Sequence, residues 1–319
     1  MGDADSVDAK RPIVPPHLLG ILCVTCAVTI FSTQDMAIKW LSGGYPLHQI
    51  VFIRAAVAIC VTLAIFVPLE GGYRSLLSKR WRLHMLRGFA IVVGNMCFFT
   101  GLASMGLAET VAVFFTAPLI ITVLAVPILG ETIRWRRMTA VLVGLLGAVI
   151  IIRPGGETFQ YAAILPLVAA FAYSCMQMMT RKLGMAEKAS VMAFYIQLMF
   201  LLASSSFWLI AGDGRFAGSG DPSAEFLLRA WIWPSPGDMA IMCTVGFFNA
   251  FGGYMISQGY RVSEAGLVAP FEYIAIPLSV FWSLFIFGER PDMWAWVGIA
   301  LICGAGIYVA LREGRRVRR

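Results

Sequence analysis

The amino-acid sequence predicts an all-α polytopic membrane protein whose ten transmembrane helices form two inverted five-helix repeats. Of its 319 residues, 59% are hydrophobic and 13% are charged, and the mean hydropathy is +0.78. Globular proteins are about 45–50% apolar and about 25% charged, so this composition excludes an ordinary soluble domain. Apolar runs of about 20 residues, the length that crosses the hydrocarbon core of a bilayer, recur along the chain. Polar and small residues also recur at fixed spacings in the two halves.

Each apolar run is near the length that one membrane-spanning helix needs. Five runs make a first repeat at residues 18–153, after a cytoplasmic tail at 1–17, and five make a second repeat at 160–311, before a basic tail at 312–319. The expected spans are residues 18–40, 46–68, 84–104, 108–130, 136–153, 160–182, 189–211, 238–261, 264–287 and 292–311.

The distribution of basic residues predicts the orientation of these spans. If the N-terminus is cytoplasmic, most of the 25 Lys and Arg residues fall in the inside segments. The outside segments keep only Lys39, Arg153, Arg215, Arg229 and Arg290. Since short cytoplasmic loops carry the excess of Lys and Arg, we expect a multi-pass protein of the cell inner membrane with both termini in the cytoplasm.

Two echoes relate the halves of the chain. The pattern [FY]-S-x-x-[DQ]-M-x-x-[KR]-x-L begins at Phe31 and again 142 positions later at Tyr173. A second set of residues repeats after 158 positions: Gly101 with Gly259, Ala117 with Ala275, Ile128 with Ile286, Gly130 with Gly288 and Glu131 with Glu289. The additional residues are expected in the long connection at 212–237. Compositional similarity between apolar helices is the alternative, and the matched polar positions argue against it. Five spans per repeat is an odd number, so the second repeat enters the membrane with inverted orientation, as in many secondary transporters.

Two long segments carry a family resemblance. The first half contains LAETVAVFFTAPLIITVLAVPILGE at 107–131, and the second contains LVAPFEYIAIPLSVFWSLFIFGE at 267–289. Each closes on Gly-Glu and carries a proline, Pro118 or Pro277. These segments resemble the tandem EamA domains of the drug/metabolite transporter superfamily, and the resemblance extends over 18–311. It implies a secondary transporter that moves a small organic solute by alternating access between its two repeats.

The fourth and ninth spans indicate a branch of that superfamily. FFTAPL at 114–119 and EYIAIP at 272–277 are similar to the branch that contains riboflavin and S-adenosylmethionine carriers alongside amino-acid exporters. This resemblance implies uptake of riboflavin or a similar aromatic metabolite. Export or exchange of amino acids, S-adenosylmethionine or drugs stays an alternative.

The sequence lacks the residues that other functional classes need. No G-x-x-x-x-G-K-[ST] motif is present, so no ATP-binding loop is expected. The three histidines are not paired at ligand spacing, so we expect neither a metal site nor a membrane-embedded enzyme, and no cofactor. A channel needs a ring of carbonyl or charged groups, usually built by oligomerisation. The net charge of +7 comes without basic residues that alternate with aromatic ones, so nucleic acid is not an expected partner.

Glu272 is the principal candidate for the substrate site, because an ionisable group inside an apolar span usually faces the bundle interior or a water-filled cavity. It can pair with a cation such as Arg54, accept hydrogen bonds from the substrate, or take up a proton and couple transport to pH. Its counterpart after the 158-residue shift is Phe114, so the site is expected to be asymmetric. A stripe of Glu272, Ser279 and Ser283 is expected on one helical face.

Further polar residues lie inside the expected spans. Arg54 could point outward to the interface, but its guanidinium also suits a carboxylate or the polar edge of a planar ring. Asp35 and Lys39 lie one turn apart and either line the cavity or pair with each other. The candidate substrate-binding residues are Asp35, Lys39, Arg54, Asn95, Phe114, Tyr173, Gln177, Asn249, Glu272, Tyr273 and Ser279.

Overall fold

The computed structural model describes residues 16–129, 135–153, 161–183, 187–218, 220–263 and 269–317, and all regular structure within these ranges is helical. The elements are α1 (Pro16–Leu41), α2 (Leu47–Val61), η1 (Thr62–Phe66), α3 (Val67–Leu69), η2 (Tyr73–Leu76), α4 (Trp81–Ser104), α5 (Leu107–Phe114), α6 (Ala117–Leu129), α7 (Trp135–Ile152), η3 (Tyr161–Ile164), α8 (Leu165–Leu183), α9 (Ala189–Ala211), α10 (Pro222–Leu228), α11 (Pro236–Val262), η5 (Ala269–Ile274), α13 (Ala275–Phe285) and α14 (Met293–Val317).

The ten predicted spans are all present as apolar helices. Within the described ranges, seven helices are long and apolar enough to cross a membrane. Three shorter apolar helices, Met138–Ile152, Phe271–Phe285 and Met293–Val309, occupy the positions of the fifth, ninth and tenth spans. The prediction of a polytopic all-α membrane protein is therefore confirmed.

The fourth and ninth spans differ from the expected single helices. The fourth is broken between α5, which ends at Phe114, and α6, which begins at Ala117. The ninth begins as the 3₁₀ segment η5 and becomes α-helical only at Ala275. Pro118, which has no backbone N–H to donate, fits the first turn of α6 but not the middle of a continuous helix. The two α-helical segments start 158 positions apart, which is the spacing of the second sequence echo.

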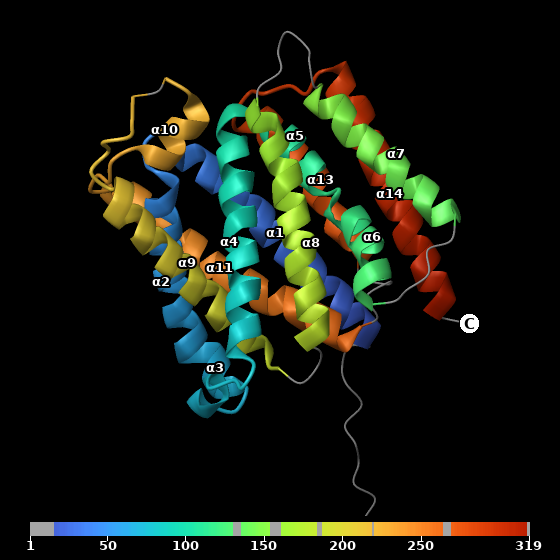
Figure 1. Cartoon of the computed structure of the whole chain (residues 1–319), viewed down its shortest axis with the longest axis horizontal. Coiled ribbons are helices and arrows are strands. Elements are labelled where there is room, and N and C mark those ends of the chain that lie inside the picture. The colour runs from blue at the N-terminus through green and yellow to red at the C-terminus, as the bar shows by residue number, and fades with distance from the viewer. Residues whose placement is uncertain are drawn as a thin grey trace, which may run out of the picture.

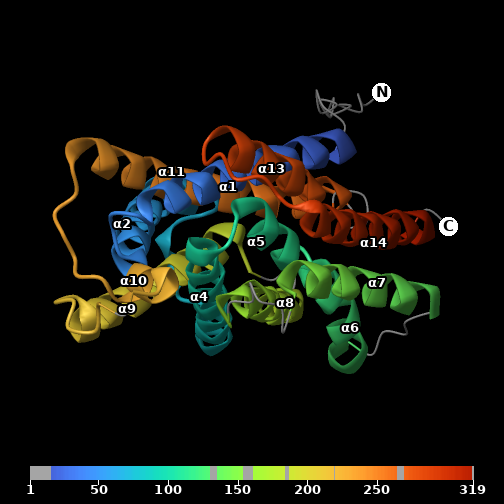
Figure 2. The same ribbon diagram turned by 90° about the horizontal axis from the view of Figure 1, so that it is seen from above.

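Helix contacts show the same two-fold relation (Figures 1 and 2). Helix α1 packs along α11, and its counterpart α8 packs along α4. Helices α2, α5 and α7 of the first half each contact their own counterparts α9, α13 and α14. The contact pattern therefore maps onto itself when the halves are exchanged, as expected of two inverted repeats.

Matched glycines make these close helix contacts. Gly88, Gly94 and Gly101 lie on α4, and Gly246, Gly252 and Gly259 lie on α11, each 158 positions later. A Cβ at Gly101 would lie 3.3 Å from the Ala162 carbonyl oxygen, and one at Gly259 would lie 3.2 Å from that of Gly20. A Cβ at Gly88 would approach Met199, and one at Gly246 would approach Val57. Each pair of partners is 142 positions apart, the spacing of the first echo. Small residues of this kind let membrane helices approach each other closely.

The connection between α9 and α11 forms a cap at one end of the bundle. We call residues 220–235, which include α10, the α10 cap; in Figure 1 it lies at the end opposite α3. Phe226 of the cap is 1% exposed, and Ser223 donates to the Thr100 carbonyl oxygen at 2.8 Å. Gln49 and Ile232 exchange two hydrogen bonds, at 2.6 and 3.3 Å. The cap lies in the connection where the sequence predicts the additional residues of the second half.

Candidate functional site

Arg54 is a fully buried cation in the middle of the bundle. It lies on α2 with 0% of its surface exposed, so it does not point outward to the interface. Its Nη2 donates to Asn95 Oδ1 on α4 at 3.1 Å. The guanidinium carbon lies 5.0 Å from the ring centroid of Phe200 and 5.9 Å from that of Phe99, within the range of cation–π contacts. Nε and Nη1 are buried and have no hydrogen-bond partner.

Three amide side chains form a chain across helices α1, α11 and α9. Asn249 Nδ2 donates to Gln34 Oε1 at 3.1 Å, and Gln197 Nε2 donates to Asn249 Oδ1. Gln34 and Gln197 are each 5% exposed. Neither was among the predicted site residues, although an amide inside an apolar span is the signal that selected Asn95. The chain joins helices from both halves and supplies polar groups at the core of the bundle.

A row of aromatic rings leads away from Arg54. Phe99, beside the guanidinium, lies 5.1 Å from Phe98, and Phe98 lies 5.2 Å from Phe114 at the end of α5. The Phe114 ring lies 5.3 Å from that of Tyr173 on α8. These centroid separations are typical of packed aromatic pairs. The row links the predicted residues Phe114 and Tyr173 to Arg54 through the buried rings of Phe98 and Phe99, and successive rings are inclined to each other by 85°, 70° and 59°.

Glu272 lies near the far end of this aromatic row. It is half-buried on η5, and its charge lies within electrostatic range of both Tyr173 and Tyr273. Gln177 donates to the Tyr173 hydroxyl at 2.8 Å. The Tyr273 hydroxyl is buried without a hydrogen-bond partner, and its ring lies 5.5 Å from that of Phe115. Carboxylate, hydroxyl and amide groups therefore gather at the end of the row away from Arg54.

The expected stripe of Glu272, Ser279 and Ser283 stays a prediction. The change from 3₁₀ to α geometry at Ala275 alters the helical phase between Glu272 and the two serines. The Ser279 hydroxyl donates to the Ile276 carbonyl oxygen of its own helix at 2.8 Å, and the residue is 1% exposed. Ser283 donates to Glu289 at 3.3 Å.

Lys39 pairs with Glu289 and not with Asp35. Its Nζ lies 2.7 Å from Glu289 Oε1 and also donates to the Met105 carbonyl oxygen at 2.9 Å. Glu289 accepts a further hydrogen bond from the Leu107 backbone N–H at 3.2 Å. This ion pair therefore ties α1 to the connections that precede α5 and α14.

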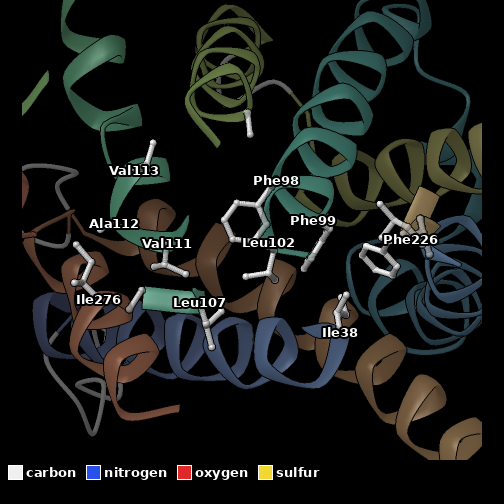
Figure 3. Packing of buried hydrophobic residues seen from close by; sticks show 14 of the residues in the cluster. Ile38, Phe98, Phe99, Leu102, Leu107, Val111, Ala112, Val113, Phe226 and Ile276 are labelled. Atoms are coloured by element: carbon white, nitrogen blue, oxygen red, sulfur yellow. The ribbon is translucent and has the colours of Figure 1, made fainter. Parts of the chain in front are cut away.

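A hydrophobic plug packs near this ion pair. Figure 3 shows side chains of α1, α4, α5 and α10 converging, among them Ile38, Leu102, Leu107 and Val111. These four residues are at most 4% exposed. Because the backbone N–H of Leu107 bonds to Glu289, the plug and the ion pair lie together at the end of the bundle that carries the α10 cap.

A separate surface pocket of about 230 Å³ lies near this closed end. Its lining includes Glu109, Arg153 and Asp292, of which Arg153 and Asp292 form an ion pair. Its lining contains none of the predicted substrate-binding residues. In the described ranges, no three His, Cys, Asp or Glu side chains are grouped to hold a metal ion.

The chain is similar to known proteins over nearly its whole length. Residues 18–153 match the EamA-like transporter family. The riboflavin transporter of Brucella anthropi is 25% identical over 91% of this chain and 98% of its own length, and that of Vibrio cholerae is 27% identical over 95% and 96%. The S-adenosylmethionine uptake transporter of Rickettsia prowazekii is 25% identical over 93% of this chain and 94% of its own length. A protein of known crystal structure, 21% identical, has the same fold with a TM-score of 0.64, over 94% of this chain and 99% of its own.

Proposed function

Because the chain belongs to the EamA-like transporter family, within the drug/metabolite transporter superfamily, we propose that it carries riboflavin or a similar planar aromatic metabolite into the cell. The protein is a multi-pass membrane carrier for a small metabolite, as its apolar helices and its relatives indicate. The relatives are named as transporters, so we propose that transport, and not catalysis, is the activity of this chain.

The aromatic row is the observation that carries the riboflavin proposal. Rings from α4, α5 and α8 follow one another at 5.1 to 5.3 Å between Phe99 and Tyr173. Phe114 and Tyr173, the partly exposed rings of the row, can pack against a planar ring of a substrate, because aromatic pairs gain free energy beyond the area they bury. The polar groups lie at the two ends, with Arg54 at one and Glu272 at the other. Small-molecule sites commonly combine an apolar lining with a few polar groups of this kind.

We place both termini in the cytoplasm of the cell and the α10 cap on the outer face of the inner membrane. The positive-inside bias of the loops supports this orientation. In this orientation we take the Lys39–Glu289 ion pair and the hydrophobic plug as the contacts that close the outer end, and they support a state that is closed towards the outside. Substrate uptake then requires the outer end to open and reclose, as alternating access demands.

S-Adenosylmethionine is the second candidate substrate, since one relative is named for its uptake. The carboxylate of Glu272 lies within electrostatic range of two tyrosines, Tyr173 and Tyr273. A carboxylate and aromatic faces together suit a sulfonium cation. This arrangement favours a positively charged adenosyl compound over a neutral flavin at that end of the row.

Glu272 is the residue on which we centre coupling to pH. A carboxyl group inside a membrane bundle can carry a proton, because burial favours its neutral form. We expect Glu272→Gln to leave the protein folded and inserted while it weakens transport or flattens its pH dependence. Glu272→Leu should abolish transport. If Glu272→Leu moves substrate at the normal rate and with the normal pH profile, Glu272 has only a structural role.

A transport screen tests the proposed function directly. The purified protein is reconstituted in liposomes, and uptake of labelled riboflavin, S-adenosylmethionine and amino acids is measured without ATP. We expect saturable uptake of labelled riboflavin, and unlabelled riboflavin should inhibit it competitively. If only S-adenosylmethionine shows saturable uptake, it is the substrate in place of riboflavin. An ohmic current in place of saturable flux would show a channel and refute the carrier.

A further inference from the structure

A groove of about 230 Å³ lies between helices α1 and α11, which pack along each other (Figure 2). We call it the α1–α11 groove. Its lining includes Thr33 and Ala37 of α1 and Ala240, Thr244 and Phe248 of α11. Ala240 and Thr244 are exposed, so the groove opens at the outer surface of the bundle and not into its interior.

The groove lies at the depth of the membrane. Both helices are long and apolar enough to cross a bilayer. From Ala240 to Phe248, α11 rises by about 12 Å, which is less than half of the about 30 Å of a hydrocarbon core. The groove therefore lies in one leaflet, the one at the capped end, because α1 ends and α11 begins there. Trp40, three residues beyond Ala37, is 60% exposed, and tryptophans of this kind lie at the membrane interface.

The lining of the groove presents mainly apolar atoms. The Thr33 hydroxyl donates to the Thr29 carbonyl oxygen at 2.9 Å, and the Thr244 hydroxyl donates to that of Ala240 at 2.8 Å. A water molecule needs two to four polar partners, which this lining does not provide. An empty groove would lose dispersion contacts along its whole length. A hydrocarbon chain suits such a lining.

The groove departs from the two-fold relation between the halves. Helices α8 and α4 are the counterparts of α1 and α11. The positions that correspond to three small lining residues carry larger side chains: Met179 for Ala37, 142 positions later, and Arg82 for Ala240 and Leu86 for Thr244, 158 positions earlier. Phe248 is the opposite case, with Ala90 as its counterpart, and it bounds the groove at the end nearer the middle of the membrane. The groove is therefore a feature of this one helix pair and not a general result of how the repeats pack.

We propose that the α1–α11 groove binds one acyl chain of a phospholipid, in the leaflet at the capped end, and holds it longer than the surrounding lipids are held. The chain lies against Ala37, Ala240 and Thr244 with its tip towards Phe248, and the headgroup lies at the level of Trp40. The lining selects the chain and not the headgroup, because the hydroxyls of its two threonines are bonded to their own helices. This inference does not depend on which metabolite the protein carries.

A photoreactive lipid tests the inference. The full-length protein is reconstituted in liposomes that contain a phosphatidylcholine with a diazirine in the middle of one acyl chain. After irradiation, lipid adducts are located by mass spectrometry of peptides. Adducts per exposed residue in 33–37 and 240–248 are compared with those in the counterpart segments 175–179 and 82–90. Because dispersion contacts add up along a bound chain, we expect at least about threefold more adducts in the groove segments. Equal labelling of both faces would mean ordinary surrounding lipid only, and the inference would be wrong.

Two substitutions fill the groove with the side chains of its counterpart. Ala37→Met and Thr244→Leu should each lower the adducts in the groove segments by about threefold or more. Ala300→Met is the matched control, since Ala300 is an exposed alanine in the half of α14 that lies at the capped end. It should leave these adducts unchanged. An equal loss in all three variants, or no loss in any, would overturn the inference. Should a filled variant not fold, the wild-type contrast between the two faces still decides.

A second copy of the chain is the other possible occupant, and a cysteine distinguishes it from lipid. Thr244→Cys, in a background without the native cysteines, places a thiol in the groove. If a lipid chain occupies the groove, mild oxidation should leave this variant monomeric on a non-reducing gel. Efficient formation of a disulfide between two copies, together with few lipid adducts in the groove segments, would show that a second copy covers the groove and would refute the lipid site.

Discussion

Glu289→Gln should shift the protein from the closed towards an open state at the end that carries the α10 cap. The carboxylate of Glu289 lies 2.7 Å from Lys39 Nζ and accepts hydrogen bonds from the Leu107 N–H at 3.2 Å and from Ser283 at 3.3 Å. The glutamine keeps the shape of the side chain and an oxygen that can accept. It removes the negative charge that faces Lys39, and with it the ionic part of the contact.

The size of the effect follows from the strength and exposure of this contact. A hydrogen bond to a charged group contributes about 1.5–3 kcal/mol. The Glu289 side chain is 37% exposed and that of Lys39 is 10% exposed, so solvent screens part of the interaction. The amide oxygen of glutamine also retains part of it. We therefore expect the closed state to lose about 1–2 kcal/mol, which changes the ratio of closed to open molecules by about 5- to 30-fold.

A cysteine in the hydrophobic plug measures this ratio. Ile38→Cys, in a background without the native cysteines, places a thiol where the native residue is 0% exposed. The rate of labelling by a membrane-impermeant maleimide from the cap side reports the open fraction. Glu289→Gln should raise this rate by about 5- to 30-fold. An unchanged rate would refute the assignment of the Lys39–Glu289 pair as the closing contact.

Asp292→Asn is the matched control, because Asp292 lies in the same connection but pairs with Arg153 instead of Lys39. It should leave the labelling rate at Ile38→Cys near that of the parent. If both substitutions raise the rate equally, the effect comes from disturbing the connection before α14 and not from the loss of the pair with Lys39.

Gly246→Ala would place a Cβ 2.7 Å from Val57 and should lower the free energy of unfolding by about 1–3 kcal/mol through overpacking. A Cβ at Gly304 would have no neighbouring atom within 4 Å, so Gly304→Ala should be neutral or stabilising in a thermal unfolding assay. Cysteines placed in 212–230 should label from outside the cell and those in 74–82 only from the cytoplasm; the reverse would invert the orientation. Hydrogen bonding from its arginine partner lowers the pKa of the Asp292 carboxyl. That pair stabilises the fold by at most about 1 kcal/mol at an exposed site. The stabilisation is present above the ordinary pKa of 3.8 and is lost as the pH falls through the lowered pKa of Asp292 in the folded protein. Asp292→Asn should therefore change the melting temperature at neutral pH but not in strong acid.

The membrane spans could be predicted because hydropathy and length are local properties of a sequence. The seventh span was expected at 189–211, and α9 begins at Ala189 and ends at Ala211. The first was expected to end at residue 40, and α1 ends at Leu41. The break in the fourth span was missed. The mainly apolar composition of the segment gives no sign of it at Phe115 and Thr116, where the α-helix ends and a new one begins. Hydropathy identifies a membrane-spanning segment but does not show where the helix within it breaks.

The partners of the polar residues were harder to predict. Lys39 and Glu289 are 250 positions apart, so the sequence offered only Asp35, one turn away, as a partner for the lysine. The chain from Gln34 through Asn249 to Gln197 likewise depends on how three helices pack. Arg54 and Asn95 were both selected as candidates, but their contact follows only from the approach of α2 and α4. The composition of the candidate site was therefore largely available from the sequence, whereas its connectivity was not. Whether these residues bind substrate stays a prediction.

The α10 cap has a consequence for the direction in which this carrier works. In a perfect inverted repeat in a symmetric membrane, the inward-open and outward-open forms would be related by a two-fold rotation and equal in free energy, and an empty carrier would divide its time evenly between them. The contacts of the cap, through Phe226, Ser223 and Ile232, differ from those of the connection at the other end, where the Ser190 N–H donates to Glu70 and Tyr195 to the Leu76 carbonyl oxygen. We therefore expect the two forms to differ in free energy, and the empty carrier to prefer the form whose capped end is shut. Such a preference would slow opening at the capped end, and shortening this one connection should change that asymmetry without altering the proposed substrate site.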